Sequence, residues 1–401
     1  MMGNLIAFRE QLGDTRLAMP EPLSREAKDG IERLASFPTT RDEAWKYTRL
    51  ARVAALQLSP LAHYQQPEPS ECSETIDVIF EPHGWFCAAP VEGLIIESAG
   101  NLAPEDWQAC TTCGHVQYLN TLAAQGGACL TIKAGYEIPK PIRIIHRAKG
   151  ENFAMVLHHQ INVEPHSKVQ FELLYEGQGQ EAYANILVDF FIAESAHVHV
   201  DKWQNTQGTH YGFYNERIYQ ERHSTFCLHT LTVNTHFTRN DVEVFSQGEA
   251  AHTKLYGVFL GGENHLIDNH TFVHHMAPNG SSDENYRGVM KGKAAGVFNG
   301  KVKVYQHAQK INAFQSNRNL LLSSAASINA KPELEIYADD VKCSHGSTTG
   351  QLDALALFYL QARGISKEKA TEMLVGAFCA EVVESVQSKH IQRAFAAYFS
   401  S

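Results

Sequence analysis

The segment INVEPHSKVQFEL, residues 161–173, joins a turn to a run in which apolar and polar residues alternate. The pattern returns twice, because Phe191-Ile-Ala-Glu194 and Ile218-Tyr-Gln-Glu221 each lead into another alternating run at intervals of about thirty residues. Alternation predicts strands with one buried face. A repeat of this length that contains only strands favours the stacked rungs of a β-helix or a related solenoid, with a β-sandwich as the alternative.

The alternating pattern runs from about residue 76 to residue 343, and helical patterns flank it on both sides. We expect Ser24 to cap an N-terminal helix. The apolar residues of that helix recur at helical spacing and are Leu23, Ala27, Ile31 and Leu34. The sequence thus predicts a mainly β protein with an N-terminal helical region and linker (1–75), a β core (76–343) and a C-terminal helical domain (344–401).

The C-terminal segment changes to a helical period after residue 346. Residues 352–362 form one expected helix, Gly364 ends it, and Ser366 caps the next. The apolar stripe of this second helix consists of Ala370, Met373, Leu374, Ala377 and Phe378. The stripe either packs between the two helices or docks another protein, and both interpretations hold if different faces are involved.

The composition is that of a folded globular protein, since 44% of the 401 residues are hydrophobic and 19% are charged. A formal net charge of -10 argues against a nucleic-acid surface. The first fourteen residues carry charges of both signs without the apolar core of a signal peptide, and no window is apolar enough to span a membrane, so we expect a cytoplasmic protein.

The eight cysteines are scattered without regular spacing, which predicts free thiols in a reducing compartment. Cys110 and Cys113 have the spacing of a metal or redox pair. A structural zinc site needs a second such pair, and none follows. We therefore interpret both as ordinary cysteines.

Motifs for nucleotide binding and hydrolysis are absent from the sequence. The segment from Gly296 to Lys301 has too few residues between its glycines for a phosphate-binding loop and no Ser or Thr for magnesium. The sequence also lacks the serine-hydrolase elbow and the zinc-protease motif. We expect a chain that is not an enzyme and binds no nucleotide, so that a partner supplies any energy needed.

The 21 histidines are numerous for this length, and His197 and His199 share one face of an expected strand. A facial metal site would need a third ligand from a neighbouring strand. The candidates are His158, His159, His223 and His229. One alternative function is therefore a His-rich, cupin-like metal-binding enzyme, although most of these histidines are expected to be polar rung or surface residues. A second alternative is a carbohydrate-active β-helix, which needs a groove with paired carboxylates and stacking aromatics that the sequence does not identify.

The triplet Cys343-Ser344-His345 places a thiol and an imidazole on one face at the expected end of the last strand. Both groups suit iron or an iron–sulfur cluster. Two ligands are too few for an ordinary cluster, which takes four, so any cluster here borrows ligands from another chain. The alternative is a thiol and a hydrogen-bonded histidine at a domain junction.

The segment LEIYADDVKCSHG (residues 334–346), together with Trp45-Lys46-Tyr47-Thr48 and Val297-Phe-Asn-Gly-Lys301, resembles the SufD family of subunits of the SufBCD iron–sulfur cluster assembly scaffold. The resemblance covers essentially the whole chain. The paralogous SufB family typically carries Glu-His-Glu at the Cys-Ser-His-Gly position, and a cluster-site cysteine in the preceding strand. Residues 323–332 contain no cysteine, which favours the SufD family.

The resemblance implies a right-handed parallel β-helix that pairs with SufB, and C-terminal helices that dock the SufC ATPase. It assigns His345 as a ligand of iron or of a transient iron–sulfur cluster shared with SufB, with Cys343 beside it. The cysteine desulfurase SufS and the sulfur carrier SufE are implied as indirect partners, and a homodimer is the alternative state of the isolated chain. The candidate SufC-docking residues are Gln351, Leu355, Phe358, Tyr359, Arg363, Met373 and Phe378.

Overall fold

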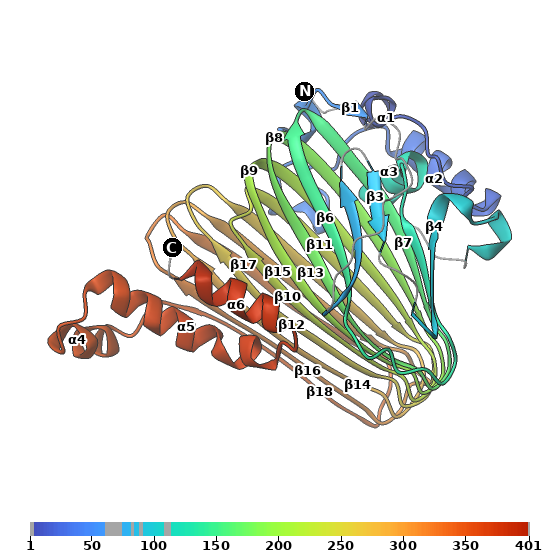
Figure 1. Ribbon diagram of the computed structural model, residues 1–401. Helices are drawn as coiled ribbons and strands as arrows, with labels where there is room; N and C mark the ends of the chain where they lie inside the picture. The colour runs from blue at the N-terminus through green and yellow to red at the C-terminus, as the bar shows by residue number, and fades with distance from the viewer. Residues whose placement is uncertain (1–3, 61–73, 82–83, 88–90, 108–113, 400–401) are drawn as a thin grey trace.

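Two parallel β-sheets wound by one chain form a β-helix of about eight turns in the computed structural model of the protein (Figure 1). The structure describes residues 4–60, 74–81, 84–87, 91–107 and 114–399, so that Cys110, Cys113 and most of the predicted linker lie outside the described residues. The mainly β class and the parallel β-helix are confirmed, and the β-sandwich is excluded. The cupin-like alternative is wrong in fold, because cupins are antiparallel jelly rolls.

We call the two sheets sheet A and sheet B. The strands of sheet A are β2 (Ile76–Glu81), β6 (Ile142–Glu151), β10 (Thr225–Val233), β12 (His252–Gly261), β14 (Ser281–Met290), β16 (Ile311–Leu321) and β18 (Val341–Gly350). The strands of sheet B are β1 (Ser59–Pro60), β5 (Ala128–Ile132), β7 (Phe153–Val163), β11 (Phe237–Ser246), β13 (Leu266–His275), β15 (Ala295–Val304) and β17 (Ser327–Ile336).

Two long strands, β8 (Lys168–Ile192) and β9 (His197–Gln220), belong to both sheets, since their first halves pair in sheet A and their second halves in sheet B. In β8, a register irregularity between Gly179 and Ala182 marks the point where the strand passes from sheet A to sheet B. Two shorter strands pair antiparallel at the N-terminal end, β3 (Gly84–Cys87) with β2 and β4 (Leu94–Ser98) with β5.

The repeat of about thirty residues corresponds to one turn of the β-helix. Ile161 lies beside Phe190, and Phe190 lies beside Ile218. The second copy of the repeat therefore begins at Phe190 and not at Phe191, so the predicted alignment is wrong by one residue there. The predicted alternation is correct in the quoted segment, because Val169, Phe171 and Leu173 are buried in the interior.

Each sheet is covered on its outer face by helices from one end of the chain (Figure 1). Sheet B carries α1 (Leu5–Leu12), α2 (Glu21–Leu34) and α3 (His115–Ala123), with the short 3-10 turns η1 (Glu43–Trp45) and η2 (Val53–Ala55). Sheet A carries α5 (Lys367–Ser385) and α6 (Lys389–Tyr398), whose apolar side chains pack on residues such as Trp203. Two further turns, η3 (Ala99–Asn101) and η4 (Pro104–Asp106), lie between β4 and α3.

The first predicted helix is present, but its start differs from the prediction. Helix α2 begins at Glu21 after Pro20, and Ser24 lies in its first turn, where its hydroxyl donates to the Glu21 carbonyl. Pro22 near the helix start fixes the backbone angle that a first turn needs, so no side-chain cap is required. The expected apolar stripe is otherwise correct, since Leu23, Ala27 and Ile31 are buried.

The C-terminal helices follow the predicted pattern with one addition. Helix α4 (Ala354–Ala362) ends before Gly364, whose φ of +85° suits glycine, and Ser366 caps α5 by accepting from the Lys369 amide. Helix α6 was not predicted. Figure 1 shows α4 extending away from the β-helix, while α5 and α6 lie against it. Across the described part of the chain, no helix is long and apolar enough to cross a membrane.

Candidate functional site

The predicted cluster ligands Cys343 and His345 lie on β18, the last strand of the β-helix. β18 pairs in parallel with β16, and within the described residues no strand is registered against its other edge. The strand continues to Gly350, so the pair lies within a strand and not at the expected seam between strand and helix. Residues 346–350 are held extended by their pairing with β16, although glycine and polar residues dominate them.

Both side chains continue rows that point into the β-helix. Cys343 lies beside Ala313 and His345 beside Gln315, and these two neighbours on β16 are buried. Cys343 is half-buried and packs against the interior core, where burial raises the pKa of its thiol. His345 is exposed, because no further turn follows to cover it. The structure therefore brings the two predicted ligands together at the open end of the interior.

Strands β17 and β18 form the uncovered end of the two sheets. We call these two strands, together with three exposed apolar residues, the open edge. Phe314, Ile336 and Tyr337 are 46%, 42% and 57% exposed. Most residues of β17 are half-exposed, whereas those of the preceding strand in sheet B are mainly buried. Edge strands present unpaired backbone groups to any strand that adds to them. The open edge therefore has both the hydrogen-bonding groups and the apolar surface of an interface.

Behind His345, the interior is polar. The Gln315 amide donates to Glu284 at 3.3 Å, and the Thr271 hydroxyl donates to the other Glu284 oxygen. Burial raises the pKa of Glu284 to about 7. The row that ends in His345 thus contains a carboxyl group that changes charge near neutral pH.

The predicted SufC-docking residues fall into two groups. Leu355, Phe358 and Tyr359 on α4 are 79%, 69% and 58% exposed. Exposed as well are Gln351, Arg363 and Met373, and the Arg363 guanidinium donates to the Tyr359 hydroxyl. Phe378 differs, because it is half-buried with its ring 5.3 Å from the Arg287 guanidinium of β14. The apolar stripe of α5 therefore packs on sheet A through Phe378, and docking of another protein by the exposed residues stays a prediction.

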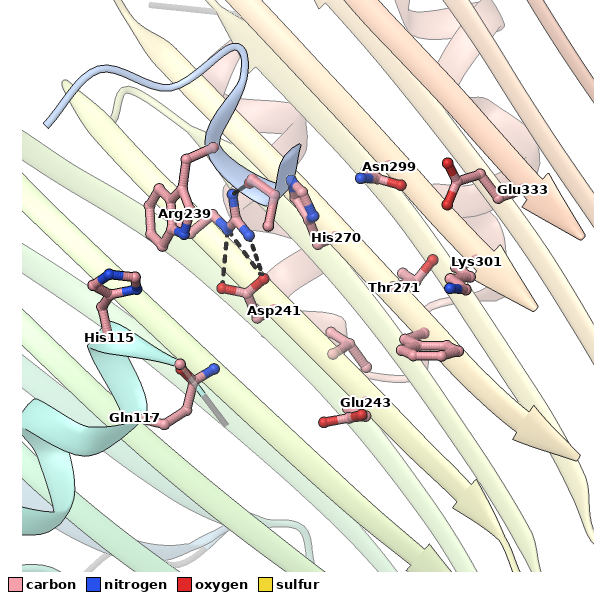
Figure 2. A pocket seen from close by; sticks show the side chains of 15 residues that line it. His115, Gln117, Arg239, Asp241, Glu243, His270, Thr271, Asn299, Lys301 and Glu333 are labelled. Carbon is pink, nitrogen blue, oxygen red and sulfur yellow. Dashed lines mark hydrogen bonds and ion pairs between the residues drawn. The ribbon is translucent and has the colours of Figure 1, made fainter. Parts of the chain in front are cut away.

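The motifs Trp45-Lys46-Tyr47-Thr48 and Val297–Lys301 meet at a cavity of about 310 Å³ on the outer face of sheet B (Figure 2). Trp45 stacks on the Arg239 guanidinium, with 4.4 Å from the guanidinium carbon to the ring centre. Arg239 also donates to Asp241 and to the buried Asp268, which accepts from the Thr48 hydroxyl. This motif therefore attaches the N-terminal segment to a buried ion pair of sheet B, through the Trp45 ring and the Thr48 hydroxyl.

The second motif, Val297–Lys301, lines the opposite wall of the same cavity. Figure 2 shows Asn299 and Lys301 on β15 across from Arg239 and Asp241. The Lys301 ammonium is paired with Glu335 at 2.6 Å, and it also lies over the Phe272 ring. Because Arg239 and Lys301 are already paired with carboxylates, we interpret the cavity as a structural junction.

The predicted histidine candidates do not form one facial site. His158 bonds to Asp189 at 2.7 Å, His159 contacts His146 at 3.0 Å, and His223 lies in an exposed turn. His197 bonds to Thr225. His199 and His229 do meet, and Cys227 lies with them.

Sequence reasoning missed Cys227 and Asp201 in this cluster. Cys227 is the cross-strand neighbour of His199, and His229 is that of Asp201. The sequence did contain a signal for this cluster. When residues 197–201 are aligned with residues 225–229, His199 falls opposite Cys227 and Asp201 falls opposite His229.

Comparison with known proteins gives a consistent assignment. Residues 146–378 match the family model described as "SUF system FeS cluster assembly, SufBD core domain". The chain is 27% identical to an iron–sulfur cluster assembly SufBD family protein of Synechocystis, over 89% of this chain and 85% of the relative. It is 26% identical to the iron–sulfur cluster assembly protein SufD of Escherichia coli, over 92% and 90%. The SufD protein of Bacillus subtilis is 27% identical over 69% and 64%.

Proposed function

Because the chain belongs to the SufBD family of the SUF iron–sulfur cluster assembly system, and is of the SufD type within it, we propose that it is a scaffold subunit whose open edge pairs with SufB. The nascent cluster, or the iron that starts it, is the cargo of this interface. His345 supplies one ligand and Cys343 lies beside it as a secondary donor. The remaining ligands come from the partner.

The observation that carries this proposal is the exposure of His345 in a row whose other members are buried. A side chain that points toward the interior of a β-helix and yet reaches solvent becomes enclosed when another chain covers the open edge. An incomplete ligand set also suits an assembly scaffold, since a cluster held by few ligands of each chain is readily passed on. A permanent redox site would instead need four ligands of its own.

The second half of the proposal concerns which subunit hydrolyses ATP. The sequence offers no phosphate-binding loop, so ATP hydrolysis belongs to a partner, the SufC ATPase. Helix α4 supports this assignment, because three large apolar side chains on one short helix are exposed and the helix extends from the body. Such residues are the usual anchors of an interface. We place the complex in the cytoplasm, with SufS and SufE as indirect sulfur donors, and expect no ATPase activity from this chain alone.

A co-purification experiment tests both halves. The tagged chain is expressed with untagged SufB and SufC, and the complex is assayed for subunit content, bound iron and acid-labile sulfide. We expect all three subunits and iron with sulfide. A tagged chain that recovers SufC but no SufB, and remains a homodimer, contradicts the assignment of the open edge. Recovery of SufB without SufC contradicts the assignment of α4.

A further inference from the structure

We propose that His199, Cys227 and His229, together with Asp201, form a binding site for a divalent transition-metal ion of the Zn²⁺ type between sheet A and the C-terminal helices. This cluster is separate from the open edge and does not depend on the proposed function. Its ligands come from neighbouring positions on β9 and β10. The β-helix register therefore fixes their spacing.

The donor atoms are close enough for one ion. One ligand atom from each of His199, Cys227 and His229 lies within 4.8 Å of the others. The Asp201 Oδ1 atom is 2.8 Å from His199 Nε2 and 3.1 Å from His229 Nδ1, so it borders the three-residue group and is the candidate fourth ligand. Two imidazoles, one thiolate and one carboxylate are a donor set that zinc accepts in tetrahedral geometry.

The hydrogen bonds of His229 give an independent reason to place a cation here. The Ser385 hydroxyl donates its proton to the Val382 carbonyl at 2.7 Å, so at its 2.8 Å contact with His229 Nε2 it accepts. The His229 proton therefore resides on Nε2, and in the neutral ring the Nδ1 lone pair faces the Asp201 carboxylate. Two acceptors at that distance repel each other unless His229 is doubly protonated or a cation lies between them.

The surroundings of the cluster resemble the outer shell of a metal site. A histidine ligand usually donates its second N–H to a neighbouring oxygen, which fixes the tautomer, and Ser385 provides that oxygen for His229. The other Asp201 oxygen accepts from the backbone amides of Gln387 at 3.0 Å and Ser388 at 2.7 Å. His229 and the Asp201 carboxylate are thus oriented before any ion arrives.

An entry path exists. A cavity of about 590 Å³ is lined by residues that include His197, His199, Cys227 and Gln387. His199 keeps 14% of its side chain exposed, whereas Asp201 and His229 are buried behind it. Burial raises the pKa of the Cys227 thiol to about 12, so the ion displaces a thiol proton, which is released to solvent.

Metal binding would join the C-terminal helices to the β-helix. Ser385 is the last residue of α5, and Ser388 caps α6 by accepting from the Ile391 amide. The α5–α6 turn therefore contacts the proposed site through a hydroxyl and two amides. An ion that binds the folded state alone stabilises this junction by mass action.

The test uses the full chain carrying Cys343→Ser and His345→Ala, so that the open edge contributes no ligand. After chelation and dialysis, the protein is titrated with Co²⁺ as the probe. We expect one equivalent to bind with a thiolate-to-cobalt charge-transfer band and the d–d bands of tetrahedral Co²⁺, and Zn²⁺ to displace it. Bound metal should also slow amide hydrogen exchange in the α5–α6 turn.

Variants in the same background assign the ligands. Cys227→Ser should remove the charge-transfer band, and His199→Gln should weaken binding at least about tenfold. Ser385→Ala should weaken it about tenfold, while His197→Gln, which lies two residues away on the same strand, should leave it unchanged. His199 is partly exposed, so its variant decides the matter if Cys227→Ser fails to fold. No stoichiometric band, or a band that survives both Cys227→Ser and His199→Gln, overturns the proposal and leaves an imidazolium–carboxylate network.

Discussion

His345 is the cross-strand neighbour of Gln315, and the first is exposed while the second is buried. The difference arises because β16 is covered by β18, whereas β18 is the last strand of sheet A. Gln315 in turn donates to Glu284, so the exposed imidazole is the outermost member of a polar row that reaches into the interior. The polar row of the interior therefore continues as far as the open edge, where His345 is its last member.

Glu284 should make the stability of the chain pH-dependent near neutrality. Its folded-state pKa of about 7 is raised above the ordinary 4.5 by burial, so the folded chain retains the proton longer than the unfolded chain. The free energy of unfolding therefore falls as pH rises from about 4.5 to about 7, and the loss is complete above that range. Glu284→Gln removes this contribution, worth up to about 3 kcal/mol.

Denaturant unfolding of both chains at pH 5 and pH 8 measures the effect. The variant should be the more stable chain at pH 8, and the difference should shrink at pH 5. Glu137→Gln, which changes an exposed carboxylate, serves as the control and should show no such trend. Parallel pH profiles of Glu284→Gln and the unchanged chain would contradict the argument.

The Arg239–Asp268 ion pair should dominate the attachment of the N-terminal segment. Arg239→Met keeps most of the side-chain stem but leaves the buried Asp268 carboxylate without its 2.7 Å partner. Removing one member of a buried pair costs about 3–5 kcal/mol. Thr48→Val removes only a hydroxyl donor to the same carboxylate and should cost about 1–3 kcal/mol.

Denaturant unfolding ranks these two variants, and limited proteolysis reports whether residues 4–60 are released first. We expect Arg239→Met to expose this segment to cleavage at denaturant concentrations where the β-helix stays protected. Equal losses for the two variants would show that the ion pair adds nothing beyond the Thr48 hydrogen bond.

The sequence was sufficient for the class of fold but not for its register. Inward positions such as Val169 and Phe171 are apolar because they pack in the buried hydrophobic core, so alternation identified them. The one-residue error at Phe190 has a physical cause. Phe191 points outward, yet it is also aromatic, because it stacks on Tyr219, which stacks on Phe245 along the outer face. Where both faces carry large apolar residues, alternation no longer marks the register.

The candidate sites show the same limit. Cys343 and His345 could be assigned to one face because they are two residues apart on one strand. The cluster of His199 and Cys227 joins two strands, so it could be recognised only once the register was known. The continuation of β18 to Gly350 was missed because Gly346 and Gly350 weaken a strand and no apolar residue alternates with the polar ones there. Backbone pairing with β16 holds these residues in an extended strand.

Helix α4 should carry the contact with SufC. Replacing Leu355 and Phe358 by Ser removes exposed apolar side chains and should weaken SufC binding at least about tenfold, because interface energy is concentrated in few residues. Thermal stability should change little, since both side chains are exposed. Pull-down with SufB and SufC, with binding measured by calorimetry, separates the two partners.

Two further variants serve as controls for this prediction. Ile6→Ser removes a 40% exposed apolar side chain from α1 and should not affect SufC. Phe378→Ser removes a ring that packs on Arg287, so it should lower stability instead of acting as a clean interface variant. Loss of SufB together with SufC in the α4 variant would mean that α4 is not a separate docking surface.

His345→Ala should separate architecture from cluster chemistry. The imidazole is exposed, so its removal should change the free energy of unfolding by no more than about 0.5 kcal/mol and leave the complex with SufB and SufC assembled. A methyl group cannot replace an imidazole nitrogen as a ligand, so reconstituted iron and sulfide should fall at least about tenfold. Cys343→Ser should be milder, because burial keeps that thiol protonated and half-covered.

Ser344→Ala is the matched control, since its side chain lies between the two ligands in sequence but points to the opposite face of β18. Melting temperature, subunit yield, bound iron and sulfide are measured on all three variants of the complex. If His345 were structural, its loss would lower the melting temperature and the subunit yield together with cluster content. A His345→Ala complex that is stable, fully assembled and builds clusters at the rate of the unchanged chain would remove His345 from the ligand set, and the open edge would then act through pairing alone.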